Sequence, residues 1–263
     1  MNISRNLRVL VVVPTLGRRL QTLEQTLHSL RTQPDIEVDI VLVVPFASDS
    51  LQTIASSFRA KLVVEKGHLS ASINRGFGEA GPDNSYLAWI GDDDMIPEGA
   101  LARSVAQLEK NADAPLCFGD CAYVDRAGRA MFTRRPPLLA SWLIQFIPGL
   151  IKSETCVFRR TAVISVGGLN EDLRFAMDLD LILRLRALGR LARCPAVQGV
   201  FCWHPGSITV SNREDSFAEA QLVQLRLTQG FPRYASLLVQ PLLKRLFLAL
   251  SHCVDRRHAG MSA

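Results

Sequence analysis

The sequence lacks a long hydrophobic run and a paired cysteine motif. Although 48% of the 263 residues are hydrophobic, no stretch reaches the roughly 20 consecutive apolar residues that span a bilayer. The six cysteines form no Cys-x-x-Cys pair, which favours buried free thiols in a reducing compartment over a disulfide framework or a zinc site. The first apolar run stops at Pro14 and is too short for a secretory signal, so we expect a cytoplasmic protein.

Low-complexity segments and internal repeats are also absent, and charged residues make up only 21% of the chain. With a mean hydropathy of +0.14, this composition excludes a disordered chain. The length suits one large domain with a proper core. Arginine outnumbers lysine by 25 to 5. Guanidinium groups suit phosphate oxygens, but an arginine-rich proteome gives the same count, and we expect no nucleic-acid partner.

The first half of the chain alternates between strand and helix patterns. Buried strands are predicted at 9–14, 38–44, 61–65 and 86–90. A helix between the first two is indicated by leucines at helical spacing, at Leu20, Leu23, Leu27 and Leu30. Pro97 is expected in the first turn of another helix. This alternation predicts an α/β fold with a mostly parallel central sheet flanked by helices.

The second half has a different pattern. Strands are predicted near 115–125, 156–160 and 191–202, with an irregular apolar stretch at 134–151 and a helix after the glycine turn at 167–168. Segment 242–258 has a basic face opposite leucines. We therefore divide the chain into one domain at 1–225, with halves 1–115 and 116–225, and an amphipathic helical tail at 226–263. The tail either contacts an anionic membrane surface or docks on the domain's own core.

Three consecutive aspartates, Asp92, Asp93 and Asp94, follow the fourth predicted strand, at the sheet edge where α/β proteins bind ligands. In extended backbone the first and third would point to one side and could bind one Mg²⁺ or Mn²⁺. Asp93 would then face a sugar hydroxyl. The alternative is a solvated acidic turn that caps the next helix.

Four further motifs stand in a definite order around this triplet: PTLGR at 14–18, KGHLSASINRG at 66–76, MDLDLILRL at 177–185 and WHPGSIT at 203–209. Together the motifs resemble the family 2 glycosyltransferases, which are inverting enzymes of the GT-A fold, over roughly residues 8 to 210. The resemblance implies metal-dependent transfer of a sugar from a nucleoside diphosphate sugar to a glycan or lipid-linked sugar acceptor. By analogy it also implies a place in bacterial surface polysaccharide or glycan biosynthesis, at the inner face of the plasma membrane.

The same resemblance assigns residues. The donor site would comprise Pro14, Thr15, Arg18, Asn74, Arg75, Asp92 and Asp93. Mn²⁺ or Mg²⁺ would be bound by Asp92, Asp94 and His204. Local alternatives remain open, since Thr15 can cap a helix, Arg18 can be a surface charge and His204 can pack beside Trp203.

Asp178 matches the family's general base, which must take the proton of the attacking hydroxyl. We expect desolvation to raise its pKa, against the opposing effect of the helix N-terminus. Asp180 is assigned a structural role, because it can pair with Arg184 one turn later. The alternative for Asp178 is a helix-start acid that only complements the helix dipole.

One departure from the family leaves the nucleotide open. Relatives carry acidic residues after the second strand that read uracil, whereas this chain has Pro45 and Phe46 there. Two other functions therefore stay open, a non-catalytic GT-A-like nucleotide-sugar-binding module and a sugar-nucleotide pyrophosphorylase.

Overall fold

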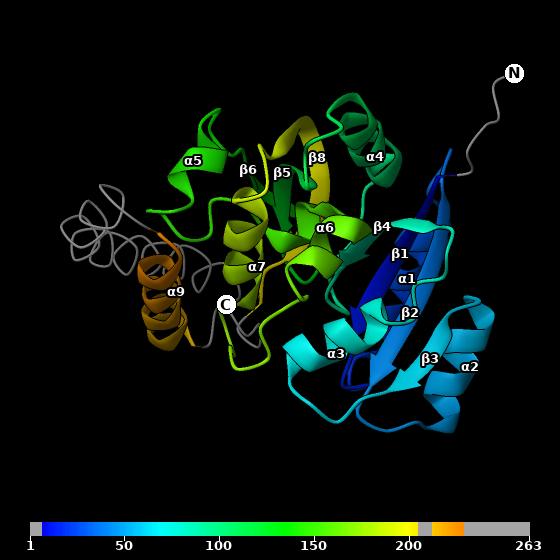
Figure 1. The fold of residues 1–263 in the computed structure, drawn as a ribbon. Coiled ribbons are helices and arrows are strands. Elements are labelled where there is room, and N and C mark those ends of the chain that lie inside the picture. Colours follow the sequence, from blue (N-terminus) through cyan, green and yellow to red (C-terminus); the bar gives the residue numbers. More distant parts are fainter. Residues whose placement is uncertain (1–6, 205–211, 229–263) are drawn as a thin grey trace, which may run out of the picture.

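The structure is a computed structural model, and it describes residues 7–204 and 212–228. Figure 1 shows a twisted central sheet with helices on both of its faces. In the first half the elements are β1 Arg8–Pro14, α1 Leu20–Arg31, β2 Glu37–Val44, α2 Asp49–Ser57, β3 Lys61–Val64, α3 Leu69–Phe77, β4 Asn84–Trp89 and α4 Ala100–Lys110. They confirm the predicted α/β alternation.

The second half extends the same sheet. Its elements are β5 Leu116–Val124, β6 Ala130–Arg134, α5 Ala140–Leu143, the 3₁₀ helix η1 Ser153–Thr155, β7 Val157–Arg159, α6 Arg160–Ser165, α7 Met177–Arg186, β8 Ala192–Cys202 and α9 Arg213–Leu227. The strand order is β3-β2-β1-β4-β7-β5-β6, and β8 pairs with β5. The two halves of the domain therefore share one sheet, and α9 crosses the boundary that the sequence suggested at residue 225.

Strand direction determines where the site lies. Strands β2, β1 and β4 are parallel, as are β2 and β3. Strand β7 is antiparallel to both β4 and β5, so β5 and its parallel partner β8 run in the same direction as β4. The carboxyl ends of β1, β4 and β8 consequently meet at one edge of the sheet, and the residues that follow these strands come together there.

The core explains why β1 is apolar on both faces. Val9, Val11 and Val13 belong to a cluster with the leucines of α1, whereas Leu10 and Val12 belong to a second cluster with Ile73 of α3 and with α7. Side chains of a strand alternate between the faces of the sheet, so both faces of β1 are covered. Burial of each such side chain contributes roughly 1.5–3 kcal/mol to stability, and β1 is thus a rigid base for the site.

Three local features differ from the sequence prediction. Helix α4 begins at Ala100 and not near Pro97, because Gly99 adopts a left-handed backbone conformation (φ 70°) immediately before it. The stretch 134–151 contains the short helix α5, and α9 was not expected. The amphipathic segment 242–258 lies outside the described residues, and none of the described helices is long and apolar enough to cross a membrane.

Helix α7 is fixed by a buried ion pair. The Asp180 carboxylate is completely buried and accepts a hydrogen bond of 2.7 Å from Nε of Arg184. Arg226 of α9 pairs with its other oxygen. The predicted pairing of Asp180 with Arg184 is therefore confirmed, and Asp180 links α7 to α9.

Replacement of this carboxylate should destabilise the fold. We expect Asp180→Asn to lower the free energy of unfolding by about 3 kcal/mol, because two guanidinium groups lose a buried anion. Urea denaturation checks this, with Asp172→Asn as the control, since Asp172 is exposed in the preceding loop. An unchanged urea midpoint for Asp180→Asn would contradict the structural role.

Candidate active site

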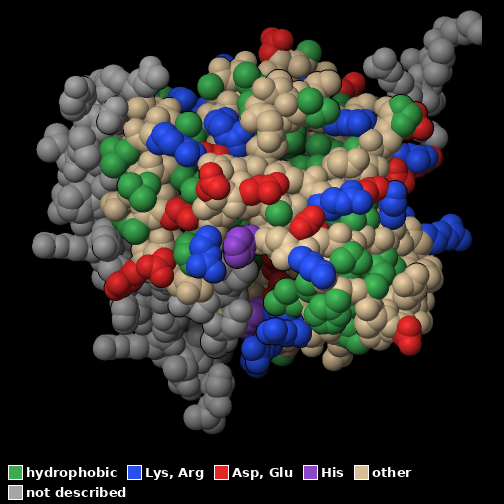
Figure 2. All heavy atoms as spheres, turned by 60° about the horizontal axis from the view of Figure 1, so that its bottom comes forward, with side chains coloured by type: hydrophobic (Ala, Val, Ile, Leu, Met, Phe, Trp, Pro, Cys, Tyr) green, Lys and Arg blue, Asp and Glu red, His purple; other side chains and the backbone are tan. Residues whose placement is uncertain are grey.

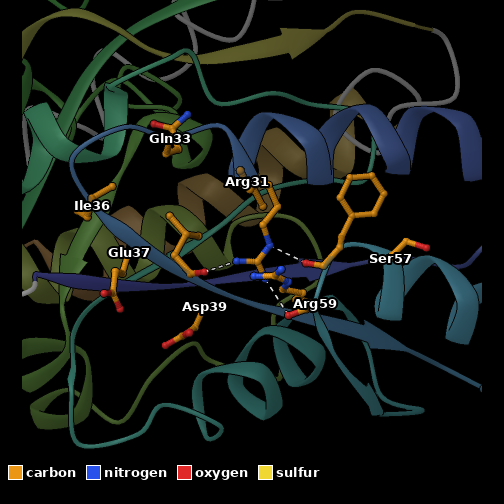
Figure 3. Close-up of a pocket in the computed structure, with 10 residues that line it drawn as sticks. Arg31, Gln33, Ile36, Glu37, Asp39, Ser57 and Arg59 are labelled. Carbon is orange, nitrogen blue, oxygen red and sulfur yellow. Dashed lines mark hydrogen bonds between the residues drawn. The ribbon is translucent and has the colours of Figure 1, made fainter.

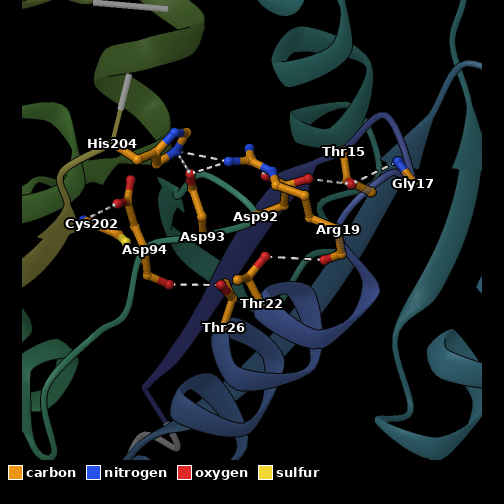
Figure 4. Close-up of polar contacts among 10 residues, drawn as sticks. All are labelled: Thr15, Gly17, Arg19, Thr22, Thr26, Asp92, Asp93, Asp94, Cys202 and His204. Atoms are coloured by element: carbon orange, nitrogen blue, oxygen red, sulfur yellow. Dashed lines mark hydrogen bonds and ion pairs between the residues drawn. The ribbon is translucent and has the colours of Figure 1, made fainter. Parts of the chain in front are cut away.

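Residues that follow three different strands meet at the shared sheet edge. Thr15 and Arg19 come after β1, the acidic triplet Asp92–Asp94 comes after β4, and His204 comes after β8 (Figure 4). Figure 2 shows this face hollowed near its centre, with acidic atoms inside the hollow and basic and histidine side chains at its rim. The sheet direction thus brings together side chains that lie far apart in the sequence.

The acidic triplet lies in a turn and not in extended backbone. The N–H of Asp94 points to the carbonyl of Gly91 at 3.4 Å, so the residues after β4 curl back on themselves. The alternation that would place the first and third carboxylates on one side is therefore absent, which corrects the prediction that Asp92 and Asp94 point the same way. Asp92 instead accepts hydrogen bonds of 2.6 Å from Thr15 Oγ1 and 2.7 Å from Arg19 Nη2.

A single arginine connects the first two acids. Nη1 of Arg19 lies 2.5 Å from Oδ2 of Asp93, while its Nη2 binds Asp92. Arg18 was expected in the donor site, but both arginines are exposed and Arg19 is the one that reaches the acids. Gly17 determines which arginine reaches the acids, because its positive φ of 69° sets the direction of the chain between β1 and α1. The adjacent arginines carry no local signal that distinguishes them.

The third acid is buried. Oδ1 of Asp94 accepts a hydrogen bond of 2.8 Å from the Cys202 N–H of β8, and its main-chain carbonyl accepts one of 2.7 Å from Thr26. Burial raises the pKa of Asp94 well above its usual range, and the negative charges of Glu154 and Asp93 add to this. Burial therefore makes the charged form of this carboxyl less favourable than that of an exposed aspartate.

His204 is buried beside the second acid. Its Nε2 lies 2.5 Å from Oδ2 of Asp93 and 2.8 Å from Nη1 of Arg19. The expected ligand set of Asp92, Asp94 and His204 does not converge, because Asp92 faces Thr15 and Arg19. Across the residues that the structure describes, no group of three acidic, histidine or cysteine side chains is arranged to hold a metal ion.

The site nevertheless fits a cation that arrives with phosphate oxygens. A Cβ on Gly91 would lie 3.0 Å from Oδ2 of Asp94 and 3.1 Å from Oδ1 of Asp93, so both carboxylates fold over the space that this glycine leaves. Magnesium is commonly bound by one or two carboxylates together with substrate phosphates, and imidazole is a further ligand for transition metals. Asp93 and Asp94 are the carboxylates that would hold Mn²⁺ or Mg²⁺ together with the donor's phosphate groups.

Asp178 lies at the start of α7, half-buried, and accepts a hydrogen bond of 2.7 Å from the Leu179 N–H. Burial raises its pKa, opposed by Lys152 and by that N–H group, with Glu154 adding to the increase. The predicted direction is therefore confirmed. Lys152 and Glu154 also act on the pKa of Asp94. The same two charged groups, one in the 3₁₀ helix η1 and one directly before it, thus act on both carboxyl groups.

Two other predicted donor-site residues have structural partners. Asn74 donates to the Leu169 carbonyl at 2.9 Å and to Glu171 at 2.8 Å, which ties α3 to the loop before α7. Arg75 pairs with Glu79, which also pairs with Lys61 at the amino end of β3. Arg75 is thus directed toward the sheet edge opposite the triplet. Pro14, the last residue of β1, is half-buried near Thr15.

A large cavity lies away from this site, beneath the amino end of β2 (Figure 3). It measures about 590 Å³ and is lined by Arg31, Arg59, Glu37 and Asp39 among others. The Arg31 guanidinium donates to three main-chain carbonyls, those of Val38, Phe58 and Arg59. These three bonds fasten α1 to β2 and to the turn after α2, and the cavity lies away from the acidic triplet.

Comparison with known proteins identifies the family. Residues 10–166 match Glycosyl transferase family 2, which is more than half of the chain. The chain therefore belongs to this family, and its fold and family support glycosyl transfer. The matched part contains the acidic triplet and Arg19, whereas Asp178 and His204 follow it.

The individual relatives are distant. The chain is 24% identical over 225 residues to the uncharacterized protein y4gI of Sinorhizobium fredii (strain NBRC 101917 / NGR234), covering 79% of this chain and about a quarter (24%) of that protein. Among solved structures, S. aureus TarS 1–349 in complex with UDP-GlcNAc has a TM-score of 0.64 at 18% identity, covering 88% of this chain and 69% of TarS 1–349. The mannosyltransferase PcManGT from Pyrobaculum calidifontis, in complex with GDP-Man and Mn²⁺, has a TM-score of 0.65 at 17% identity, covering 96% and 75%.

Arg19 should act as the counter-cation of the acidic triplet. We expect Arg19→Gln to lower the free energy of unfolding by about 1 kcal/mol, because Asp92 and Asp93 then repel each other without a shared guanidinium. Added Mn²⁺ should restore part of the lost stability by binding the folded state. Thermal unfolding with and without Mn²⁺ measures both effects. Arg18→Gln, which makes the same change on an exposed neighbour, is the control, and equal behaviour of the two variants would contradict this role.

Proposed function

We propose that this protein is an inverting, metal-dependent glycosyltransferase that moves a sugar from a nucleoside diphosphate sugar to a sugar hydroxyl. The observation that carries the proposal is the placement of Asp178. The Asp178 carboxylate is influenced by the same two charged groups, Lys152 and Glu154, as Asp94 of the acidic triplet, and Asp93 of that triplet contacts Arg19 and His204. Family 2 membership supplies the reaction class.

On the donor side, the residues after β1 and β4 bind the nucleotide. Thr15 and Arg19 are already oriented by Asp92, and the Arg19 guanidinium is near enough to the triplet to donate to a phosphate held there. A divalent cation at Asp93 and Asp94 would supply charge compensation for the leaving diphosphate. This role would replace the contact with a ribose or sugar hydroxyl that the sequence suggested for Asp93.

On the acceptor side, Asp178 acts as the general base. It accepts the proton of the attacking hydroxyl while that oxygen approaches the sugar from the face opposite the diphosphate. Burial keeps the pKa of this carboxyl above that of an exposed aspartate, which makes it a better proton acceptor. The Lys152 ammonium opposes that increase and so favours the deprotonated form that a base requires.

The nucleotide itself is not fixed by the usual acids. Phe46, which stands where relatives have acids just after β2, is 61% exposed. Ser48 caps α2, because its Oγ accepts a hydrogen bond from the Leu51 N–H. An exposed aromatic ring at this edge favours recognition of the base by stacking, which tolerates several bases. The solved complexes of similar fold contain UDP-GlcNAc in one case and GDP-Man in the other, so both nucleotide classes are candidates.

A second function retains one supporting observation. The missing acids after β2 favour a non-catalytic nucleotide-sugar-binding module, whereas the half-buried Asp178 favours catalysis. Donor hydrolysis in Mn²⁺ separates the two, because a binding module would not release the sugar. Family membership favours transfer over pyrophosphorylase activity. A glycan or lipid-linked acceptor and a role in bacterial surface polysaccharide synthesis remain part of the proposal.

The base assignment predicts a specific kinetic defect. Asp178→Asn should slow turnover by about 10²–10⁴-fold, since the proton of the acceptor hydroxyl loses its acceptor. Donor affinity should be unchanged, because Asp178 is assigned no contact with nucleotide or cation. Transfer kinetics and donor calorimetry measure these quantities, with Asp172→Asn as an exposed-acid control. Turnover by Asp178→Asn at the wild-type rate would show that another group is the base.

A further inference from the structure

Helix α9 lies against α7, the helix whose first turn contains Asp178 (Figure 1). It begins at Arg213, well after residue 166, where the family match ends. Two of its polar contacts reach α7 and the loop before it. One is with residues that precede Asp178 in the sequence, and the other is with a residue that follows it. The first involves Glu219 and the second is the ion pair between Arg226 and Asp180.

Glu219 of α9 accepts hydrogen bonds from the backbone directly before α7, although the two segments are far apart in the sequence. Its carboxylate accepts hydrogen bonds from the N–H groups of Arg174 at 3.0 Å, Phe175 at 2.6 Å and Ala176 at 2.7 Å. Of these three residues, Ala176 is the cap residue of α7, and its side chain cannot itself accept a hydrogen bond, while Arg174 and Phe175 belong to the loop directly before the helix. The backbone that leads into α7 therefore depends on a carboxylate 43 to 45 positions later.

These bonds hold the backbone that presents Asp178. The three N–H groups belong to the residues directly before Met177 and Asp178, so their position sets where the Asp178 carboxylate lies. The bonds of Glu219 in this region are to main-chain N–H groups, so its influence on the base is exerted through backbone geometry.

We infer that Glu219 is a positioning residue for the catalytic base, and that α9 is thus part of the active-site framework. The inference rests on the proposed role of Asp178. A misplacement of about 1 Å can cost up to about 100-fold in rate, so we expect Glu219→Gln to lower kcat by about 10- to 100-fold. Its amide offers only one acceptor oxygen to three N–H groups. Glu219→Asp, which keeps both oxygens, should recover part of the rate.

The experiment is a double-mutant cycle in the full chain. Single-turnover transfer is measured for wild type, Glu219→Gln, Asp178→Asn and the double variant, together with donor KM and nucleotide affinity in Mn²⁺. If Glu219 acts through Asp178, its replacement adds little to the loss in Asp178→Asn, whereas independent effects multiply. Donor affinity should stay within about twofold of wild type in all variants. Glu214→Gln, an exposed acid in the first turn of α9, is the matched control.

Several outcomes would overturn the inference. Wild-type turnover by Glu219→Gln, fully multiplicative losses in the double variant, or a fall in donor affinity that accounts for the rate would each do so. Failure of Glu219→Gln to fold is detected by loss of the donor-induced thermal shift. Glu219→Asp then decides the question, and wild-type kcat in that variant overturns the inference. Wild-type turnover by Asp178→Asn overturns the proposed base, and the inference with it. An inactive Asp178→Asn beside a fully active Glu219→Gln overturns the inference alone.

Discussion

Two carboxylates after the central strand β4 share the guanidinium of Arg19, and the rest of the site is arranged around that contact. Unit charges about 4 Å apart interact by about 4 kcal/mol at an effective dielectric constant of about 20, so a cation between Asp92 and Asp93 can offset their repulsion. Thr15 and His204 contact the same two acids. Asp94 completes the triplet differently, since its carboxyl is buried and burial raises its pKa. These contacts keep three acids together at the edge where a diphosphate and its cation would bind.

This arrangement depends on elements that are far apart in the chain. The triplet and Arg19 lie inside the family match, whereas His204, Asp178 and helix α9 follow it. The shared direction of β4 and β8 brings His204 to Asp93, and η1 brings Glu154 near both Asp94 and Asp178. The triplet and Arg19 thus lie in the part of the chain that matches the family, whereas the proposed base and the residue that positions it lie in the part that follows.

Local patterns predicted the fold well where a single element determined the outcome. The leucine spacing of α1 and the apolar run of β1 report burial directly, because both faces of the strand are covered. The pairing of Asp180 with Arg184 was also predictable, since it spans one helical turn. Sequence reasoning was less successful where one backbone angle sets a direction. Gly17 makes Arg19 and not Arg18 the contact, and Gly99 delays the start of α4.

Long-range partners could not be predicted in the same way. The turn at Gly91 invalidates the alternation expected of Asp92 and Asp94. Nothing near Glu219 in the sequence indicates that it bonds to the backbone before a helix more than 40 residues earlier.

Calorimetric titration of the wild-type chain with UDP-, GDP- and dTDP-sugars, in Mn²⁺ and again in EDTA, tests most directly whether this site binds a nucleotide sugar together with a cation. We expect that at least one donor binds and that its affinity falls when the cation is removed. Absence of binding by all three, or equal affinity in EDTA, would contradict it.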